Sequence, residues 1–380
     1  MTAMSRFSAW IAIAIVTFTN FLFADKYFSR FSDWGLLAAL GYTLGFTAIL
    51  VALPKTARHH WTRNRFFLLL GTASLFWIVI FFLTDVTTLR VDRWYMIDTF
   101  LNNLFAGIYP YTPNPNSNIP SPFPFYYALA MPFYLNGEIG YWSIVGLLLY
   151  ALFARNVLKL SQAKSFWIIV ALLLSVSFDW EMYTRSTLFI NMVIVVGYCY
   201  ALLKARLTTR LDWLMLGLCG GLVLATRAIA IIPIAVCAIY RFKREMNWNR
   251  FLAFGAMAAL GFLGTLLPLY LWSPELFFKY NPLLVESFFL PKVIVLAILA
   301  TSILAGFHAN TPRDCLFYAG LLIFASVGLG FALSILSFGW DRTIFQTTFD
   351  ISYFLLPLPF VMLFLYDEQV ARGEPASRVL

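Results

Sequence analysis

The sequence predicts an all-α polytopic membrane protein with about 12 transmembrane helices. Of the 380 residues, 61% are hydrophobic and only 12% are charged, whereas soluble domains contain about 45–50% and about 25%, respectively. One globular core of this size could not bury so many apolar side chains, so lipid must cover many of them. Apolar stretches recur along the whole chain, and we therefore expect residues 1–380 to form a single transmembrane domain.

Twelve apolar stretches are expected to cross the membrane, although several are shorter than the roughly 20 residues that a straight span needs. They lie near residues 10–23, 34–53, 66–83, 139–155, 166–178, 186–203, 212–226, 229–240, 251–271, 293–308, 314–337 and 351–366. The first lacks the small-residue pattern of a cleavage site, so we expect it to be retained as a helix. Arg227 interrupts what would otherwise be one long helix, and we divide the stretch there.

The distribution of charge predicts how the chain is oriented. If the N-terminus is cytoplasmic, most of the 27 basic residues fall in cytoplasmic loops and most of the 18 acidic residues fall outside. Because Lys and Arg in short loops are retained on the cytoplasmic side, this asymmetry places both termini there. It also explains the net charge of +9, so nucleic acid is not a predicted partner.

The longest interval without a span is the external loop 84–138, whose first part reads as an amphipathic helix over residues 92–106. Its apolar stripe consists of Trp94, Ile97, Leu101, Leu104 and Phe105. Its polar stripe consists of Tyr95, Asp98 and Asn102. Because these residues recur at helical spacing, with Trp and Tyr near the start, we expect the helix to lie flat in the outer headgroup region.

The second part of this loop is rich in proline. Gly107 should end the helix, and the prolines of residues 107–124 favour an extended loop. Residues 124–135 are apolar but too short to span, so they predict a re-entrant or membrane-dipping segment.

Several external charged side chains are candidates for chemistry. They are Asp85, Asp92, Asp98, Asp179, Glu181, Arg185, Arg227 and Lys279. An ionised Asp can take a proton from an acceptor hydroxyl as it attacks an activated carbon, and Arg or Lys can hold a phosphate leaving group.

Each candidate also has a structural interpretation. Asp92 could be the N-cap of its helix, and Asp85 could be a solvated residue at the end of a span. Asp179 and Glu181 could pair with Arg185, and Arg227 could extend to the membrane surface rather than face a protein cavity.

Histidine and cysteine give no further candidates. The three histidines map to the cytoplasmic side, so an external His base or metal ligand is not expected. The four cysteines lie in or beside apolar spans and predict neither a disulfide framework nor a metal cluster.

The external loop resembles that of a known enzyme family. The runs DRWYMIDTFLNNLFAGIYPY (92–111) and SPFPFYYALAMPFY (121–134) resemble the first external loop of GT-C glycosyltransferases, most narrowly the polyprenyl-phosphate-mannose-dependent mannosyltransferases. The matching positions are Asp92, Tyr95, Gly107, Pro110 and Tyr111. Residues 183–202 and 221–236 resemble two further stretches of the family, in the second of which Arg227 occupies the place of a Lys or Arg. The tandem acidic pair of the family is missing, so Asp85 and Asp92 both remain candidates for the base.

This resemblance implies an inverting transfer in cell-envelope glycan biosynthesis. A sugar would move from a polyprenyl-phosphate donor, which enters laterally from the membrane, to a lipid-linked or glycan acceptor outside a bacterial plasma membrane. Asp92 or Asp85 would be the base, and Arg227, helped by Arg185 or Lys279, would hold the phosphate. The other expected substrate contacts are Tyr95, Asp98, Asn102, Tyr111, Asp179 and Glu181.

No cofactor is predicted, although the carboxylates would also suit a divalent metal ion. Two other functions remain open. A transporter or flippase of lipid-linked sugars should have charged or broken helices near the bilayer midplane, and often paired repeats. An O-antigen polymerase-like protein would share the number of spans and the large external loop.

Overall fold

The computed structural model describes residues 3–56, 63–89, 91–114, 119–283 and 290–366. All regular structure in these ranges is helical. Five helices are long and apolar enough to cross a membrane, and two bent pairs bring the number to seven if each pair is one span. The chain is therefore a multi-pass helical membrane protein, while the total of 12 spans and the cytoplasmic termini stay predictions.

The five long helices are α1 (Ala3–Phe28), α2 (Gly35–Thr56), α3 (Arg63–Leu83), α12 (Trp248–Trp272) and α16 (Pro312–Phe338). The bent pairs are α5 (Pro124–Leu135) with α6 (Gly140–Leu152) and its π-helical extension η2 (Phe153–Val157), at 112°, and α7 (Gln162–Leu173) with α8 (Val176–Tyr183), at 70°. The other apolar helices are α9 (Leu188–Lys204), α10 (Arg210–Leu224), α11 (Ile231–Glu245), α15 (Lys292–His308) and α18 (Leu358–Tyr366). Short elements are η1 (Val86–Thr88), α4 (Asp92–Phe105), η3 (Ala228–Ala230), α13 (Pro274–Lys279), α17 (Trp340–Ile344) and η4 (Ile351–Leu355).

Each of the 12 predicted spans overlaps a helix, but the span predicted at 166–178 is wrong as one continuous helix. It breaks at Leu174 and Ser175, between α7 and α8. The hydroxyl of Tyr42 donates to the carbonyl oxygen of Leu174 (2.8 Å) and accepts from the amide of Val176 (3.1 Å). Asn20 accepts from the hydroxyl of Ser175 (2.9 Å). Side chains of α1 and α2 thus satisfy the polar groups that the break exposes, as a bilayer interior requires.

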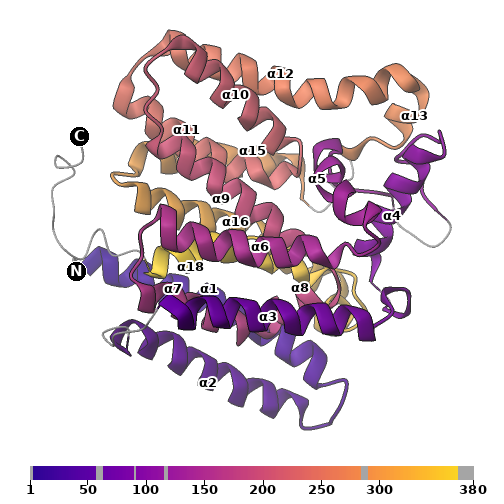
Figure 1. Cartoon of the computed structure of the whole chain (residues 1–380), viewed down its shortest axis with the longest axis vertical. Helices are drawn as coiled ribbons and strands as arrows, with labels where there is room; N and C mark the ends of the chain where they lie inside the picture. Colours follow the sequence, from indigo (N-terminus) through magenta and orange to yellow (C-terminus); the bar gives the residue numbers. More distant parts are fainter. Residues whose placement is uncertain (1–2, 57–62, 90, 115–118, 284–289, 367–380) are drawn as a thin grey trace.

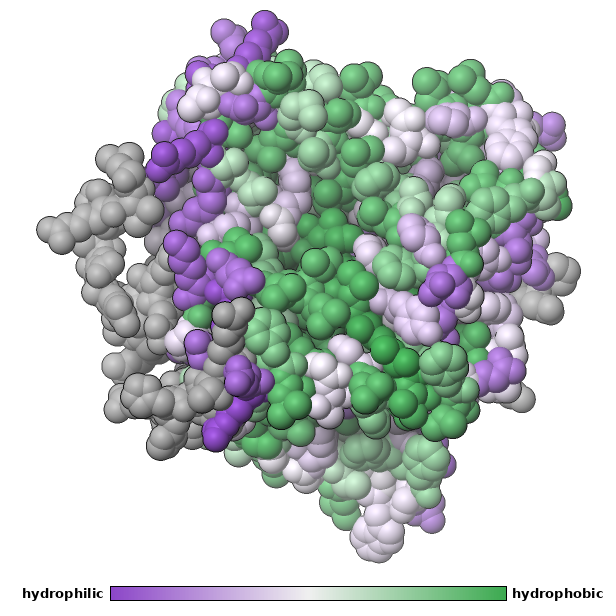
Figure 2. Space-filling view, viewed as in Figure 1, coloured by the Kyte–Doolittle hydropathy of each residue, from purple (hydrophilic) through white to green (hydrophobic). Residues whose placement is uncertain are grey.

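Basic side chains at one end of the bundle bind carbonyl oxygens at helix C-termini. At one end, Arg241 at the C-terminus of α11 donates to the carbonyl oxygen of Ala205, just beyond α9, and Lys243 donates to that of Ala309, just beyond α15. Cations at helix C-termini are favourable because the last carbonyls lack partners within the helix. The opposite end carries α4, α5 and α13 (Figure 1). Figure 2 shows a broad band of hydrophobic side chains between two more hydrophilic ends, as a bilayer requires.

The amphipathic helix predicted at residues 92–106 is confirmed as α4. Its apolar stripe does not face lipid along its whole length, which corrects the expectation. Ile97 and Leu101 are buried in a second core cluster with residues of α5, α12 and α13. Phe100 of α4 stacks on Tyr127 of α5, with the ring centroids 3.7 Å apart. Phe105 remains at the surface.

The segments after α4 also follow the predicted pattern. Gly107 has a φ of +71° at the end of α4, a conformation that glycine adopts without strain. The described parts of the loop 107–124 contain no helix before α5 begins at Pro124. The chain then turns by 112° between α5 and α6, which is the geometry of a broken span or a re-entrant helix.

Candidate functional site

A cavity of about 760 Å³ lies where α4, η3, α13 and η4 meet α15, α16 and the start of α11. Its charged lining consists of Asp92, Arg93, Arg227, Lys279 and Asp350. Its apolar lining includes Ile229, Ile231, Ile232, Val295, Ile298 and Leu299. The cavity therefore suits a ligand with an anionic head and an apolar body.

Asp92 is the first residue of α4, and its carboxylate does not cap the helix. The N-cap is Val91, which makes no side-chain capping bond. The interpretation of Asp92 as an N-cap is therefore wrong.

Arg227 lies in the break between α10 and α11, and its side chain is turned into the protein. The residue is only 3% exposed, and its guanidinium lies over the ring of Tyr126, 5.2 Å from the centroid. Tyr126 in turn shares a hydrogen bond with Thr187 at the start of α9. Of the two environments that the sequence allowed, Arg227 thus occupies the protein cavity and not the membrane surface.

Lys279 reaches the same cavity from the last position of α13. Its ammonium lies 5.1 Å from the ring centroid of Tyr280. The structure therefore brings together Asp92, Arg227 and Lys279, three candidates from distant parts of the chain.

Two further charged residues of the cavity, Arg93 and Asp350, lie in predicted external loops but were given no role from the sequence. Arg93 forms an ion pair with Asp350, and its guanidinium lies over the ring of Tyr353, 5.1 Å from the centroid. Asp350 also accepts a hydrogen bond of 2.9 Å from the amide of Ser352 and so caps η4. The position of Arg93 directly after Asp92 is the one local signal in the sequence. Nothing local points to Asp350, because it lies 257 residues from Arg93.

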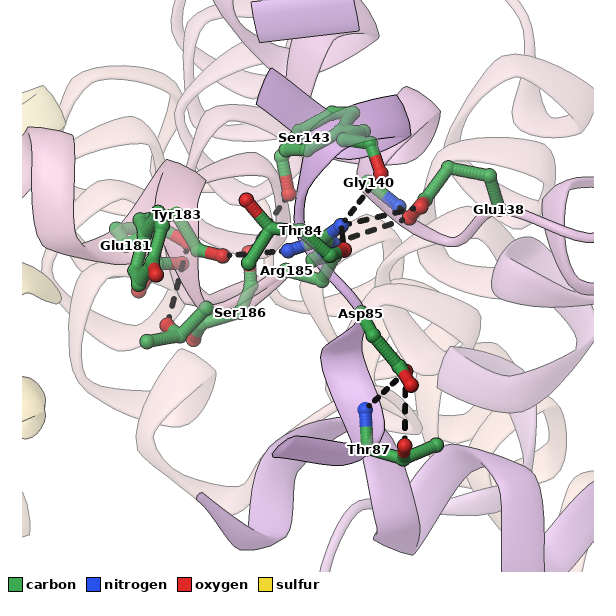
Figure 3. A network of polar contacts seen from close by, with 12 residues as sticks. Thr84, Asp85, Thr87, Glu138, Gly140, Ser143, Glu181, Tyr183, Arg185 and Ser186 are labelled. Carbon is green, nitrogen blue, oxygen red and sulfur yellow. Dashed lines mark hydrogen bonds and ion pairs between the residues drawn. The ribbon is translucent and has the colours of Figure 1, made fainter. Parts of the chain in front are cut away.

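Arg185 lies outside the cavity lining, within the network shown in Figure 3. Its buried guanidinium donates to the carbonyl oxygens of Phe81 (3.0 Å), Thr84 (2.7 Å) and Tyr183 (3.0 Å). It also forms an ion pair with Glu138 (3.5 Å). The pairing of Arg185 with Asp179 or Glu181 is therefore corrected, and these contacts assign Arg185 to holding α3, α6 and the turn before α9 together.

The other acidic candidates also lie outside the cavity lining. The exposed Asp85 caps η1 by accepting from the amide (2.9 Å) and hydroxyl (2.8 Å) of Thr87, which lowers the pKa of the Asp85 carboxyl. Glu181 is buried and accepts a hydrogen bond of 2.9 Å from the amide of Phe189. Asp179 lies in the same short helix as Glu181, α8.

The polar stripe of α4 forms its own cluster outside the cavity lining. The hydroxyl of Tyr134 contacts Asp98 (3.1 Å) and Asn102 (2.7 Å), and Asn102 donates to Asp98 (3.0 Å). Tyr95 donates to the carbonyl oxygen of Thr87 (3.1 Å), and the buried Tyr111 donates to that of Pro122 (2.7 Å). Tyr95 and Tyr111 thus hold the loop 84–138 in place.

Within the described ranges, no three His, Cys, Asp or Glu side chains are grouped so that they could hold a metal ion. In comparisons with known proteins, no protein-family model, no curated protein and no solved structure matches the chain.

Proposed function

We propose that the cavity is the active site of an inverting glycosyltransferase of the cell envelope. The enzyme would move a sugar from a polyprenyl-phosphate donor to a lipid-linked or glycan acceptor on the extracytoplasmic side. The observation that carries this proposal is the meeting of Asp92, Arg227 and Lys279 in one cavity with an apolar lining. A general base, cations for a phosphate and a surface for a lipid are the groups that such a reaction needs.

The shape and lining of the cavity support a lipid-phosphate donor. Its volume of about 760 Å³ falls within the usual range for small-molecule sites, about 300–1,000 Å³. Arg227 and Lys279 would bind the phosphate by charge-assisted hydrogen bonds. Apolar residues of α11 and α15, such as Ile232 and Ile298, would cover the first part of the polyprenyl chain.

The chemistry needs one carboxylate. Asp92 would accept the proton of the acceptor hydroxyl while the acceptor oxygen attacks the anomeric carbon of the donor. The bond from that carbon to the phosphate oxygen breaks, and its electron pair stays with the phosphate, where Arg227 and Lys279 stabilise the charge. Attack from the face opposite the phosphate inverts the anomeric centre. A phosphate leaves without protonation, so no second acid is required.

A transporter or flippase of lipid-linked sugars is the second candidate. The observation that favours it is the 70° break between α7 and α8, beside the buried Glu181 and Arg185. Broken helices with buried charges are typical of transporters.

The test is a transfer assay in nanodiscs with labelled polyprenyl-phosphate sugars and a membrane-lipid extract as acceptor. Asp92→Asn should lower transfer by about 10²- to 10⁴-fold, the usual contribution of a general base. Asp85→Asn is the matched control, because Asp85 lies outside the cavity lining, and it should retain transfer. Melting temperatures would establish that both variants are folded.

Two results would refute the assignment: no turnover with any donor, or full activity of Asp92→Asn. Movement of labelled lipid across proteoliposomes, unchanged in Asp92→Asn, would instead support the transporter.

A further inference from the structure

The Arg93 guanidinium is held in place from two sides at the wall of the cavity. Its Nη2 pairs with the carboxylate of Asp350, and its face lies over the ring of Tyr353. The residue is only 7% exposed. These contacts join α4 to η4 and fix the direction of a side chain that would otherwise have many rotamers.

The remaining terminal nitrogen of Arg93 has no such contact. Nη1 is buried and, among the residues that the structure describes, has no hydrogen-bond partner. Buried donors in proteins are bonded in about nine cases out of ten, and an exception calls for an explanation. Nη1 has almost no accessible surface where it stands, but Arg93 lines the cavity. A small rotation of the guanidinium would therefore offer Nη1 to a ligand there.

The charges of the cavity indicate which chemical group that ligand carries. Arg93, Arg227 and Lys279 face two carboxylates, Asp92 and Asp350. The excess of one positive charge favours an anion, and the planar guanidinium favours one with several oxygens, such as a phosphate. The adjoining apolar lining favours a phosphate that is attached to a lipid.

We propose that Arg93 binds the phosphate of the lipid donor directly through Nη1, and that Asp350 is the residue that positions Arg93. The proposal rests on the proposed function only for the identity of the lipid, since phosphate binding does not require transfer. Asp350 is itself fixed, because its other oxygen accepts from the amide of Ser352 (2.9 Å). Ser352 thus fixes Asp350, and Asp350 holds Arg93 at the cavity wall before the ligand arrives. This reduces the entropy lost on binding.

The test compares the binding of a polyprenyl monophosphate with that of the uncharged polyprenol of equal length to the full-length protein in detergent. Arg93→Ala should lose tenfold or more of its affinity for the monophosphate, since a hydrogen bond to a charged group is worth about one to two orders of magnitude. Its affinity for the polyprenol should be unchanged. Arg342→Ala is the matched control, because Arg342 is an exposed arginine of α17 outside the cavity lining.

Asp350 is tested by two variants that separate positioning from folding. Asp350→Asn keeps an oxygen that can accept from Arg93, so it should retain most of the preference for the monophosphate. Asp350→Ala should lose that preference several-fold while it still binds polyprenol. If Asp350→Ala loses affinity for the monophosphate and for the polyprenol in parallel, the Arg93–Asp350 pair only holds the fold together. This result would overturn the proposal.

The outcomes distinguish this proposal from the proposed function. The wild type could transfer sugar while Arg93→Ala binds the monophosphate as tightly as the wild type. This result would overturn the role of Arg93 and leave the proposed function intact. Binding that depends on Arg93, in a protein that transfers no sugar, would support the role of Arg93 and overturn the transferase. A wild type with no preference for monophosphate over polyprenol would also overturn the role of Arg93.

Discussion

The backbone amide of Phe123 donates a hydrogen bond of 3.1 Å to the carbonyl oxygen of Thr226. A second bond of 3.1 Å runs from the amide of Phe125 to the carbonyl oxygen of Ala225. These bonds attach the end of the proline-rich loop to the break between α10 and α11, directly before Arg227. Tyr126, which follows Phe125 in the first turn of α5, lies with its ring against the Arg227 guanidinium. The loop and the break thus form one unit that orients Arg227 at the cavity wall.

Replacement of Arg227 should affect transfer more than folding. Arg227→Ala removes charge-assisted hydrogen bonds to the phosphate and should lower kcat/KM by about 10- to 100-fold. Arg227→Lys keeps the charge without the fork of donors, so its loss should be smaller. The loss of the contact with Tyr126 should lower stability by only about 1 kcal/mol. Kinetics with a saturating acceptor and a thermal-unfolding assay would measure both effects, and unchanged kcat/KM would remove Arg227 from the site.

Arg185 should behave in the opposite way, since its donors go to backbone carbonyls and Glu138. Arg185→Ala leaves buried carbonyl oxygens without donors and should lower the free energy of unfolding by about 2–4 kcal/mol. Glu138→Gln keeps an acceptor oxygen and should cost less. The check is denaturant unfolding in detergent together with the specific activity of the folded fraction. A folded Arg185→Ala protein with normal stability but no transfer would return Arg185 to the active site.

The helical class, the bounds of α4 and the break at Arg227 could be predicted because composition and periodicity are local properties. The Arg93–Asp350 pair could not, because nothing local relates residues 257 positions apart. The break between α7 and α8 was also missed, since the polar groups that satisfy it come from Asn20 and Tyr42 on other helices.

Arg185 shows a similar limit of sequence reasoning. Its charge and predicted external position suit a phosphate ligand as well as those of Arg227 do. Only the packing shows that one arginine is used by backbone carbonyls and the other lines a cavity.

The close packing of α10 against α12 depends on Gly221. A Cβ at this position would lie 2.1 Å from the carbonyl oxygen of Ala258 and 2.8 Å from the amide nitrogen of Phe262. Gly221→Ala should therefore force the helices apart and destabilise the protein by about 1–3 kcal/mol. Gly255→Ala in α12 is the matched control, because nothing lies within 4 Å of its added carbon. Thermal unfolding of the two variants should differ clearly, and equal melting temperatures would show that the helix pair adjusts freely.

The carboxyl of Asp98 provides a prediction that depends on pH. Partial burial raises the pKa of Asp98 above its ordinary value of 3.8, although the hydrogen bonds from Tyr134 and Asn102 act in the opposite direction. A carboxyl with a raised pKa in the folded state binds its proton more tightly there than in the unfolded state. Its ionisation therefore lowers stability, by an amount that grows as the pH rises from 3.8 to the raised value and is constant above it.

Asp98→Asn keeps an oxygen that can accept from Tyr134 and Asn102 but carries no charge. At pH 7 its melting temperature should equal or exceed that of the wild type, and the difference should shrink as the pH falls toward 4. Thermal unfolding of both proteins across this range measures the effect, with Asp85→Asn as a comparison. Because the pKa of Asp85 is lowered below 3.8, its ionisation stabilises the fold by a nearly constant amount across this range, so the difference between Asp85→Asn and the wild type should not change with pH. A lower melting temperature of Asp98→Asn at pH 7 would mean that the charge of Asp98 stabilises the junction of α4 and α5 through contacts with cations.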